Sequence, residues 1–485
     1  MQYSEQELEK LIREVVTNTL KQSTPASKHD DNKFSSSDGI FDNINDAIEA
    51  AFSAQIILQR DYSLEDRSRF IKAIKNFSLE EKTKLARMIV EETNLGNYED
   101  KVLKHELAAR TAGVEDLEQY VKTGDTGLAL TEMAPFGVIG ATTPVTNPTE
   151  TIISNGIAML AAGNTIVFNV HPSSKNVCAY AVSKINQAIQ TVGGPKNLMT
   201  MVKVPTMETL ESLAQHPKVN LLMGTGGPGL VRSLLKSGKK AIGAGAGNPP
   251  VIVDETAIID KAAKDIITGN SFDNNIVCIL EKEVFVIDKV ANQLIQSMQS
   301  HGAFYLKSDQ VEALMNLVLE KHHSDKPVGC SYRQSRYVTK KEWVGQDPYK
   351  YLDAIGISYK HKPKNLICET DKDHPFVQLE LLMPILPIVR TTNLEQAITY
   401  AVEAEHNNKH TAMIHSQNIQ NITKFAKAIN TTIFVKNAPS LAGIGVNSEG
   451  IVSYSIAGPT GEGITTARTF TRKRHCVLVD GFRII

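Results

Sequence analysis

The chain has few of the residues and patterns that mark several large classes of protein. Five cysteines among 485 residues are too few for a disulfide scaffold, and their odd number is typical of a reduced, intracellular protein. No apolar run approaches the roughly 20 residues of a membrane-spanning helix. Lys and Arg total 52 and Asp and Glu total 53, so no excess of positive charge is available to wrap a nucleic acid. The N-terminus lacks the basic region and apolar core of a secretory signal. We therefore expect an intracellular protein without membrane or nucleic-acid partners and without a metal site.

The first twenty residues predict a separate amphipathic helix. Ser4 and Glu7 form an S-x-x-E capping box, which is typical of a helix N-terminus. Apolar residues then recur at helical spacing and form one stripe. Residues 21–38 contain almost no apolar side chains, which predicts a flexible linker. The stripe consists of Leu8, Leu11, Ile12, Val15, Val16 and Leu20.

The apolar face of this tethered helix needs a cover, and the residues leave two alternatives open. The helix folds back onto the body of the protein or onto a second subunit, or it docks into the groove of a partner protein. A helix lying on a membrane surface is disfavoured, because its polar face carries mostly Glu rather than Lys or Arg.

From residue 40 onward, short apolar runs alternate with stretches of helical periodicity. A helix is expected over residues 46–57. Strands that alternate with helices are typical of βαβ units and parallel sheets, so we predict two α/β domains with a cleft between them. The expected strands lie at residues 137–140, 165–168, 198–202, 219–223, 250–253, 283–287 and 385–389.

Two glycine-rich segments are candidates for binding a ligand. Residues 224–229 read GTGGPG and fit the G-x-G-x-x-G pattern between an expected strand and a helix beginning near Leu230. The acidic partner that usually follows is missing, since Asp254 lies beyond the next strand. A tight strand-to-helix turn explains the pattern equally well. Residues 243–248, GAGAGN, are expected to form a second flexible turn, which either admits a ligand to the backbone or joins the two domains.

The cysteines differ in their suitability as nucleophiles. Cys178 lies on an apolar helix and Cys368 in an apolar run, so both are expected to pack in the core. Cys476 follows the basic residues 472–475, and positive charge lowers the pKa of a thiol. Cys278 follows the polar, turn-prone residues 271–275 and precedes an apolar strand. Composition does not choose between Cys278 and Cys476.

Several spaced segments together resemble the aldehyde dehydrogenase superfamily. The resemblance spans residues 40–485, and the tail at 461–472 is similar to that of the CoA-acylating branch, in particular the enzymes of bacterial microcompartments that act on propionaldehyde and acetaldehyde. The other matching segments are residues 133–148, 162–172, 225–227, 273–278 and 380–384.

This resemblance implies a fold and a set of segments. The fold would be aldehyde dehydrogenase-like, with a Rossmann-like cofactor domain at residues 39–246 and a catalytic domain at 247–445. Residues 122–133 and the C-terminal return at 446–485, with a strand at 474–478, would join subunits into a dimer or tetramer. The helix at 1–20 would be an encapsulation peptide that binds a shell protein through residues 4–20. The enzyme would then lie inside a microcompartment in the bacterial cytoplasm.

The resemblance also implies a mechanism, and it selects Cys278 as the nucleophile. The thiolate would attack an aldehyde, while the Asn147 amide and the Cys278 backbone N–H hold the oxyanion. Hydride transfer to the nicotinamide would leave a thioester on Cys278. Without the resemblance, Asn147 reads as a turn residue before Pro148. The residues that the resemblance assigns to cofactor binding are Thr143, Pro144, Asn169, His171, Thr225, Gly226, Gly227, Glu380 and Pro384.

One departure from the superfamily pattern concerns the fate of the thioester. Hydrolytic members carry a glutamate that activates water, and Gly243 stands at that position here. Its absence disfavours hydrolysis, unless another residue supplies a base, and leaves the thioester to a stronger nucleophile. The thiol of coenzyme A is such a nucleophile, and it would reuse the vacated dinucleotide cleft.

The cofactor and the aldehyde are less sharply defined. Asn169 and Pro172 replace the Lys and Glu of many family members, so NAD is expected from the resemblance, while these residues do not discriminate against NADP. Val277 and Ile279 flank the nucleophile and suggest an apolar aldehyde tail. Propionaldehyde is favoured and acetaldehyde should also react, since one methylene changes binding by only about 1–3 kcal/mol. The alternatives are a hydrolytic or phosphate-forming semialdehyde dehydrogenase and a non-catalytic scaffold protein of the same fold.

Overall fold

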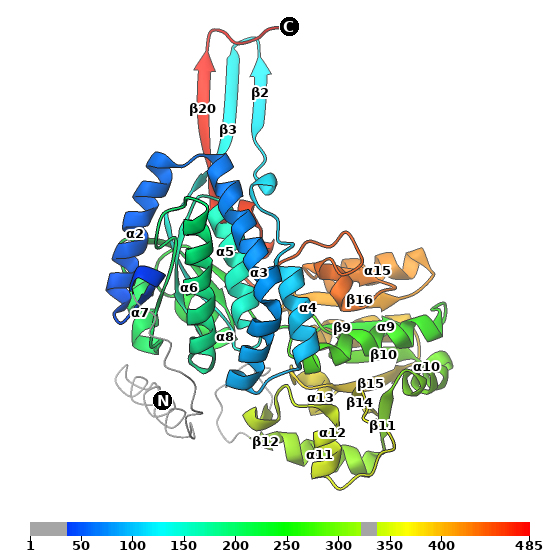
Figure 1. Ribbon diagram of the computed structural model, residues 1–485. Coiled ribbons are helices and arrows are strands. Elements are labelled where there is room, and N and C mark those ends of the chain that lie inside the picture. Colours follow the sequence, from blue (N-terminus) through cyan, green and yellow to red (C-terminus); the bar gives the residue numbers. More distant parts are fainter. Residues whose placement is uncertain (1–35, 322–336) are drawn as a thin grey trace, which may run out of the picture. The chain divides into compact units, whose positions relative to one another are not determined.

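The computed structural model describes residues 36–321 and 337–485, which form two parallel sheets with helices packed against them (Figure 1). The first sheet has six strands in the order β1-β6-β5-β4-β7-β8, and every neighbouring pair is parallel. The strands are β1 (Ile40–Phe41), β4 (Val138–Thr142), β5 (Thr165–Asn169), β6 (Met199–Val202), β7 (Val219–Thr225) and β8 (Ala241–Ala244). The helices of this part are α2 (Ile44–Asp61), α3 (Leu64–Thr93), α4 (Tyr98–Ala108), α5 (Pro148–Ala161), α6 (Lys175–Thr191), α7 (Met207–Gln215) and α8 (Pro228–Leu235).

The strands of this sheet are nearly continuous apolar runs because helices cover both faces. Every residue of β4 and β5 is buried. The helix expected at residues 46–57 is confirmed as α2, which begins two residues earlier because the Asn43 side chain caps it by accepting from the backbone N–H of Asn45. Its buried face carries Ile44, Ala47 and Ile48, which pack with strand residues in one core cluster.

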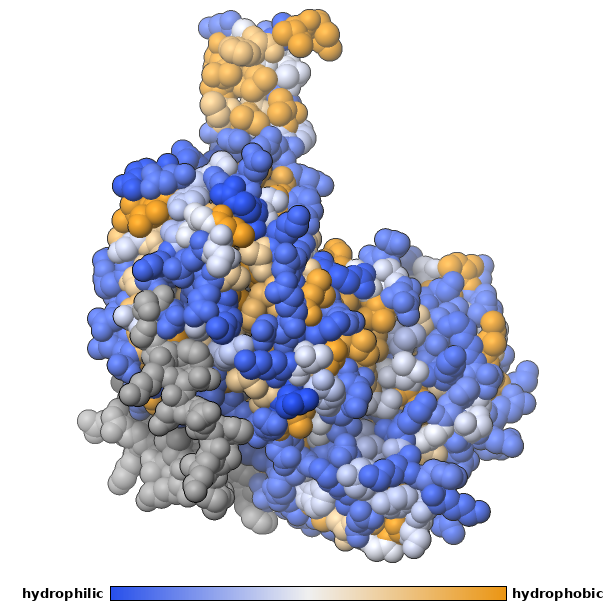
Figure 2. All heavy atoms as spheres, in the orientation of Figure 1, coloured by the Kyte–Doolittle hydropathy of each residue, from blue (hydrophilic) through white to orange (hydrophobic). Residues whose placement is uncertain are grey.

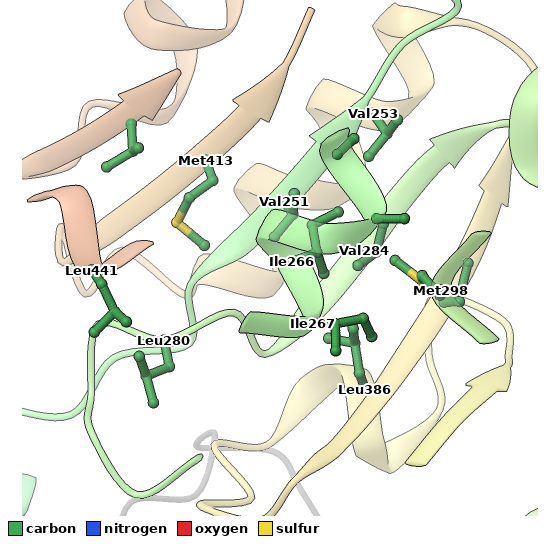
Figure 3. Close-up of a cluster of buried hydrophobic side chains, with 14 of the residues drawn as sticks. Val251, Val253, Ile266, Ile267, Leu280, Val284, Met298, Leu386, Met413 and Leu441 are labelled. Carbon is green, nitrogen blue, oxygen red and sulfur yellow. The ribbon is translucent and has the colours of Figure 1, made fainter. Parts of the chain in front are cut away.

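The second sheet has seven strands in the order β11-β14-β15-β10-β9-β16-β17, again all parallel. Its core brings Val251 and Val284 of neighbouring strands against Ile266 of α9 (Figure 3). Leu280, two residues after Cys278, belongs to the same cluster and anchors that turn. The strands are β9 (Pro250–Val253), β10 (Glu283–Ile287), β11 (Ala303–Leu306), β14 (Asn365–Glu369), β15 (Ile385–Thr391), β16 (Thr411–His415) and β17 (Ile433–Lys436). The helices are α9 (Ile259–Ser271), α10 (Asp288–Ser300), α11 (Ser308–Val318), α12 (Pro348–Ala354), α13 (Pro375–Gln378), α14 (Leu394–Glu405) and α15 (Ile419–Ile429).

All the strands expected from the sequence between residues 137 and 389 are confirmed, and so is the α/β fold class. The boundary predicted at residues 246–247 falls in the link between the two sheets, since β8 ends at Ala244 and β9 begins at Pro250. Two antiparallel pairs complete this body: β12 (Leu319–Lys321) with β13 (Tyr337–Thr339), and β18 (Ile456–Ala457) with β19 (Gly463–Ile464).

A third, antiparallel sheet extends beyond the helices of the first (Figure 1). It consists of β2 (Tyr120–Gly124), β3 (Gly127–Pro135) and the C-terminal strand β20 (Thr471–Val479), with His475 opposite Thr131. The segments predicted to join subunits, 122–133 and 474–478, lie in this sheet. Apolar side chains gather on its surface (Figure 2), and Val477 and Val479 are 65% and 68% exposed.

The N-terminal predictions are mostly outside the described residues. This applies to the helix at 1–20 and to residues 21–35 of the expected linker. The last three linker residues are described, and for them the prediction of flexibility is wrong. Ser36–Asp38 form a short 3-10 helix, and Asp38 accepts hydrogen bonds from the side chains of Asn186 and Gln187 on α6. Among the residues in the two described ranges, no helix is long and apolar enough to cross a membrane.

Candidate active site

Three strand-to-helix turns meet at one edge of the first sheet. β5, β4 and β7 are adjacent and parallel, so the turns after their carboxyl ends lie side by side. The chain passes from β6 back across β4 to β7, and such a switch in strand order is where α/β sheets bind ligands. The predicted cofactor residues on these turns are Thr143, Pro144, Asn169, His171, Thr225, Gly226 and Gly227.

The glycine-rich sequence at 224–229 does form the expected strand-turn-helix. β7 ends at Thr225, Gly227 is the residue before α8, and Gly226 adopts a φ of 155°. A Cβ on Gly226 would lie 2.9 Å from a Leu230 methyl, so glycine keeps the turn close to the helix. The Thr225 N–H donates to Thr142 Oγ1 at 3.1 Å, which ties this turn to the end of β4. The backbone N–H groups at the N-terminus of a helix are suited to binding a pyrophosphate.

The other predicted cofactor residues have partners of their own. Asn169 Oδ1 accepts from Thr209 Oγ1 at 2.7 Å, and Thr225 Oγ1 lies 2.7 Å from Ser455 Oγ. His171 is exposed, and its Nδ1 accepts from the Ser173 N–H at 3.2 Å. The cofactor role of all three therefore stays a prediction. Pro384 is buried just before β15, where its carbonyl accepts from the Leu366 N–H, so its evident role is in the sheet.

The nucleophile turn, residues 273–278, has an unusual backbone. Asp273, Asn274 and Asn275 adopt φ values of 46°, 51° and 64° in succession. Asn and Asp tolerate the left-handed region better than other residues with a Cβ, which explains why three of them stand here. The turn leads from α9 to the partly buried Cys278. The loop then continues to Lys282, and β10 begins at the next residue.

The side chains of these three residues hold the strained turn in place. Asn274 Nδ2 donates to the Gly345 carbonyl and to Asp347 Oδ1, both at 3.0 Å. Asn275 Nδ2 donates to the carbonyl of Asn270 at 2.9 Å. Asp273 is bound by lysines from α4. Several hydrogen bonds and ion pairs thus hold the turn in its strained backbone conformation, and such strain is common at functional sites.

Lys282 binds the same turn from the other side. Its buried ammonium donates to Asn275 O at 2.8 Å and to Asn275 Oδ1 at 2.6 Å. Burial, followed by the nearby Glu380 carboxylate, raises the pKa of the Cys278 thiol to about 12, although Lys282 acts in the opposite direction. Cys278 is therefore protonated at neutral pH, and its attack on a carbonyl requires a proton acceptor.

Gly247 is the point where three groups of the site meet. Its N–H donates to Glu380 Oε1 at 3.4 Å. A Cβ at this position would lie 2.9 Å from the Cys278 carbonyl oxygen and 2.7 Å from Cγ of His410. Glycine is thus needed at 247 to let the nucleophile turn, Glu380 and His410 approach one another.

His410 is a site residue that sequence reasoning missed. It precedes β16, it is buried, and its Nε2 has no hydrogen-bond partner within residues 36–321 and 337–485. Burial, and secondarily Lys282, lowers the pKa of His410 to about 4, so the imidazole is neutral at physiological pH and is a weak base. The sequence offers no signal to find it, because His415 is also buried and neutral without lying at the site.

Asn147 ends the turn after β4 and precedes α5. Its side chain does not cap the helix; Nδ2 lies 3.2 Å from Thr146 Oγ1, and Oδ1 has no partner in the part of the chain that the structure describes. Pro148 occupies the first helical position, where a missing N–H is tolerated. Asn147 Nδ2 has a second N–H besides the one donated to Thr146, and this N–H is the group that could donate to an oxyanion.

The flexible turn that was expected at residues 243–248 begins later than the sequence predicts. Residues 243 and 244 belong to β8, where Gly243 pairs with Gly224 and its N–H donates to Thr460 Oγ1 at 3.1 Å. The prediction fails for these two residues, because strand pairing overrides the flexibility of the glycine-rich sequence, whereas residues 245–248 form part of the link to β9. A Cβ at Gly243 would lie 2.4 Å from a methyl of Val231 on α8, so glycine lets the helix pack closely on the strand.

The structure also separates the two candidate cysteines. Cys476 is exposed on β20 opposite Leu130, whereas Cys278 lies with Gly247 and His410. Cys178 and Cys368 are fully buried, as expected for packing residues. Val277 and Ile279 belong to the core cluster of the second sheet, so their evident role is in packing. Among residues 36–321 and 337–485, no cluster of three or more His, Cys, Asp or Glu side chains is arranged to hold a metal.

A partly buried thiol, a buried amide and a neutral imidazole beside a nucleotide-type sheet edge are typical of a thiol-dependent enzyme that works with a nucleotide. The chain belongs to the aldehyde dehydrogenase family, whose family model matches residues 16–474.

The curated relatives cover the chain almost completely. It is 42% identical over 484 residues to the acetaldehyde dehydrogenase (acetylating) EutE of Salmonella typhimurium, with 99% of this chain and 100% of the relative covered. It is 44% identical over 480 residues to a propanal dehydrogenase (CoA-propanoylating) of Citrobacter freundii, with 99% of both chains covered.

Solved structures agree with the fold. A propionaldehyde dehydrogenase from the fucose utilisation bacterial microcompartment of Clostridium phytofermentans superposes with a TM-score of 0.87 at 47% identity, covering 92% of this chain and 100% of that one. A Rhodopseudomonas palustris propionaldehyde dehydrogenase with bound CoA and an acylated cysteine gives 0.86 at 46% identity, covering 91% and 98%.

Proposed function

We propose that the protein oxidises a short-chain aldehyde with NAD and transfers the acyl group to coenzyme A. The observation that carries this proposal is the glycine at position 243. Hydrolytic relatives carry a glutamate there that activates water, whereas Gly243 has no carboxylate, so the thioester on Cys278 is left to a thiol rather than to hydroxide. The CoA-dependent relatives and the CoA-bound neighbour support the same conclusion.

The first step forms a carbon–sulfur bond. The Cys278 thiol loses its proton to solvent, and the thiolate sulfur attacks the aldehyde carbon. The carbonyl oxygen becomes an oxyanion, which accepts hydrogen bonds from the Asn147 amide and the Cys278 N–H. A low-dielectric site strengthens both bonds, because Asn147 and the nucleophile turn are buried.

The second step breaks the carbon–hydrogen bond of the adduct and restores the carbonyl. Bound nicotinamide supplies the two-electron acceptor that takes up this hydride. The turns after β4, β5 and β7 would bind the dinucleotide, with residues 225–227 at the pyrophosphate and Glu380 at the nicotinamide ribose. Cys278 then carries the acyl group as a thioester.

The third step exchanges one thioester for another. The coenzyme A thiol loses its proton to solvent, its sulfur attacks the acyl carbon, and the displaced Cys278 thiolate takes up a proton. The reaction therefore releases one proton overall and needs no oxidant besides the nicotinamide. Exchange of one thioester for another of similar energy makes this step reversible.

The favoured substrate is propionaldehyde, and acetaldehyde should also react. Relatives named for each aldehyde are similar to this chain at 44% and 42% identity, a difference too small to decide. An acetaldehyde-specific enzyme of ethanolamine-type metabolism is therefore the second candidate. NAD is the proposed cofactor, although Asn169 and Pro172 place no carboxylate where it would reject the 2′-phosphate of NADP.

The proposed acylating activity is tested by identifying the product of the complete reaction. With propionaldehyde, NAD and coenzyme A, we expect one propionyl-CoA per NADH, measured by mass spectrometry and absorbance. Propionate at the same rate as NADH would contradict the acylating mechanism. Equal kcat/KM for NADP and NAD would overturn only the choice of cofactor.

We also propose that the enzyme is packaged in a bacterial microcompartment in the cytoplasm, with residues 4–20 docking to a shell protein. The microcompartment neighbour supports this proposal. Deleting residues 1–20 is expected to leave kcat and KM unchanged but to abolish co-purification with shells. Unchanged co-purification of the truncated enzyme would refute this role.

The three-stranded sheet is proposed to join subunits into a dimer or tetramer. Among the described strands, β2 and β20 each pair only with β3, so both edges of the sheet are open. Open edges with exposed apolar residues such as Val477 and Val479 are typical of surfaces that pair with another chain.

A further inference from the structure

One buried ammonium contacts both catalytic loops. Lys104 lies on α4 and is 1% exposed. Its Nζ is 2.6 Å from Asp273 Oδ2 at the start of the nucleophile turn. The same nitrogen is 3.0 Å from the Thr146 carbonyl and 3.2 Å from Glu150 Oε1, and these two residues flank Asn147.

The two loops come from different sheets. Asn147 follows β4 of the first sheet, whereas the nucleophile turn precedes β10 of the second. Neither sheet alone fixes the distance between the Asn147 amide and the Cys278 sulfur. Lys104 belongs to neither sheet, and an ammonium has three N–H donors, so one residue can set the spacing of both loops.

The carboxyl groups that contact Lys104 are stabilised in their ionised form. Although burial raises the pKa of Asp273, Lys101 and Lys104 outweigh burial and lower the pKa below its usual value. Lys104 likewise outweighs burial at Glu150 and lowers the pKa of that carboxyl. Asp273 and Glu150 thus have ammonium partners within the interior, as buried charges require, and a third carboxyl, that of Asp100, accepts from the Asp273 N–H at 2.7 Å.

We propose that Lys104 is a positioning residue that holds the Asn147 amide in register with Cys278. This inference rests on the proposed roles of those two residues in the acylating reaction. A shift of about 1 Å between an oxyanion donor and a nucleophile costs about 10²-fold in rate. Lys104 acts through the loops and touches no reacting atom.

Lys101 provides a matched control. It lies one turn earlier on the same helix, it is also buried, and its Nζ is 3.0 Å from the same Asp273 Oδ2. Within the described ranges, Lys101 Nζ makes no hydrogen bond or ion pair with Thr146 or Glu150, so of the two loops it contacts only the nucleophile turn. Replacing either lysine by Met removes one buried positive charge from the surroundings of Asp273, and Met is similar in size to the lysine side chain that it replaces.

The experiment is a pair of double-mutant cycles with Asn147→Ala, measured as kcat for propionaldehyde, NAD and coenzyme A. Lys104→Met is expected to lower kcat about 10²-fold. In the Asn147→Ala background the same substitution should lower kcat less than threefold, because the amide that it positions is already gone. Lys101→Met should lower kcat by the same factor in both backgrounds. The KM for NAD should stay within twofold, which reports an intact cofactor edge, and an unchanged melting temperature excludes a general loss of folding.

Two outcomes overturn the inference. One is a Lys104→Met effect that multiplies fully with Asn147→Ala, and the other is an equal coupling of Lys101→Met to Asn147→Ala. Either leaves the proposed function intact. If Asn147→Ala itself leaves kcat unchanged, the oxyanion role fails and this inference fails with it. Lys104→Gln, which keeps one hydrogen-bond donor, is run in parallel and replaces Lys104→Met if the latter does not fold.

Discussion

Cys278→Ala is expected to abolish NADH formation from propionaldehyde, with a loss of at least about 10⁴-fold in kcat, because no thioester forms without the sulfur. The turn itself should persist, since its shape depends on Asp273, Asn274 and Asn275 rather than on the thiol. Cys476→Ala is the control and should keep full activity, because this thiol lies on β20 away from Gly247. Full activity of Cys278→Ala would refute the assignment of the nucleophile.

The pH dependence of the same thiol gives a second readout of this prediction. Burial and Glu380 raise the pKa of Cys278 to about 12, so the thiolate fraction in the free enzyme grows about tenfold for each pH unit up to that value. Iodoacetamide alkylation of the Cys278 peptide, followed by mass spectrometry, should therefore keep rising between pH 7 and pH 10. A plateau below pH 8 would show that the free thiol is already ionised near neutrality.

Asn147→Ala is expected to lower kcat by about 10²–10³-fold, the usual cost of removing one oxyanion donor. The Cys278 N–H remains as the second donor, so a residual rate persists. Because the Asn147 side chain makes no cap bond to α5, the helix should keep its stability, and the melting temperature should change little. The KM for NAD is the control for an intact cofactor edge.

A loss of less than about fivefold in Asn147→Ala would contradict the oxyanion role. A loss accompanied by a large fall in melting temperature would assign Asn147 to the structure instead. Alkylation of Cys278 at the wild-type rate would locate the defect after formation of the thiolate, where oxyanion stabilisation acts.

Local sequence predicts the sheets well because each strand carries its own signal. The apolar runs of β4, β5 and β9 are continuous, as parallel strands require, and GTGGPG sits between β7 and α8 as expected. The same local rules fail at Gly243 and at Ser36–Asp38. In both places, partners far along the chain, Gly224 and α6, impose an ordered conformation on a flexible sequence.

The site depends more on such distant partners than the fold does. Cys278 and Asn147 are identified through a family resemblance, since composition leaves Cys476 as an equal candidate. His410 and Lys104 have no local signal, because a buried His or Lys shows its role only through what surrounds it. Gly247 brings His410 close to the nucleophile turn across 132 residues of sequence, and Lys104 joins two loops from different sheets.

The most direct test of the central claim is a rapid-mixing measurement of NADH formation from propionaldehyde and NAD in the absence of coenzyme A. The absence of a carboxylate at Gly243 predicts a burst of one NADH per Cys278 followed by a halt, with the acyl group found on Cys278 by mass spectrometry. Addition of coenzyme A should then release propionyl-CoA and restart turnover. Continued NADH formation without coenzyme A, with propionate as the product, would show that water reaches the thioester and would contradict the account.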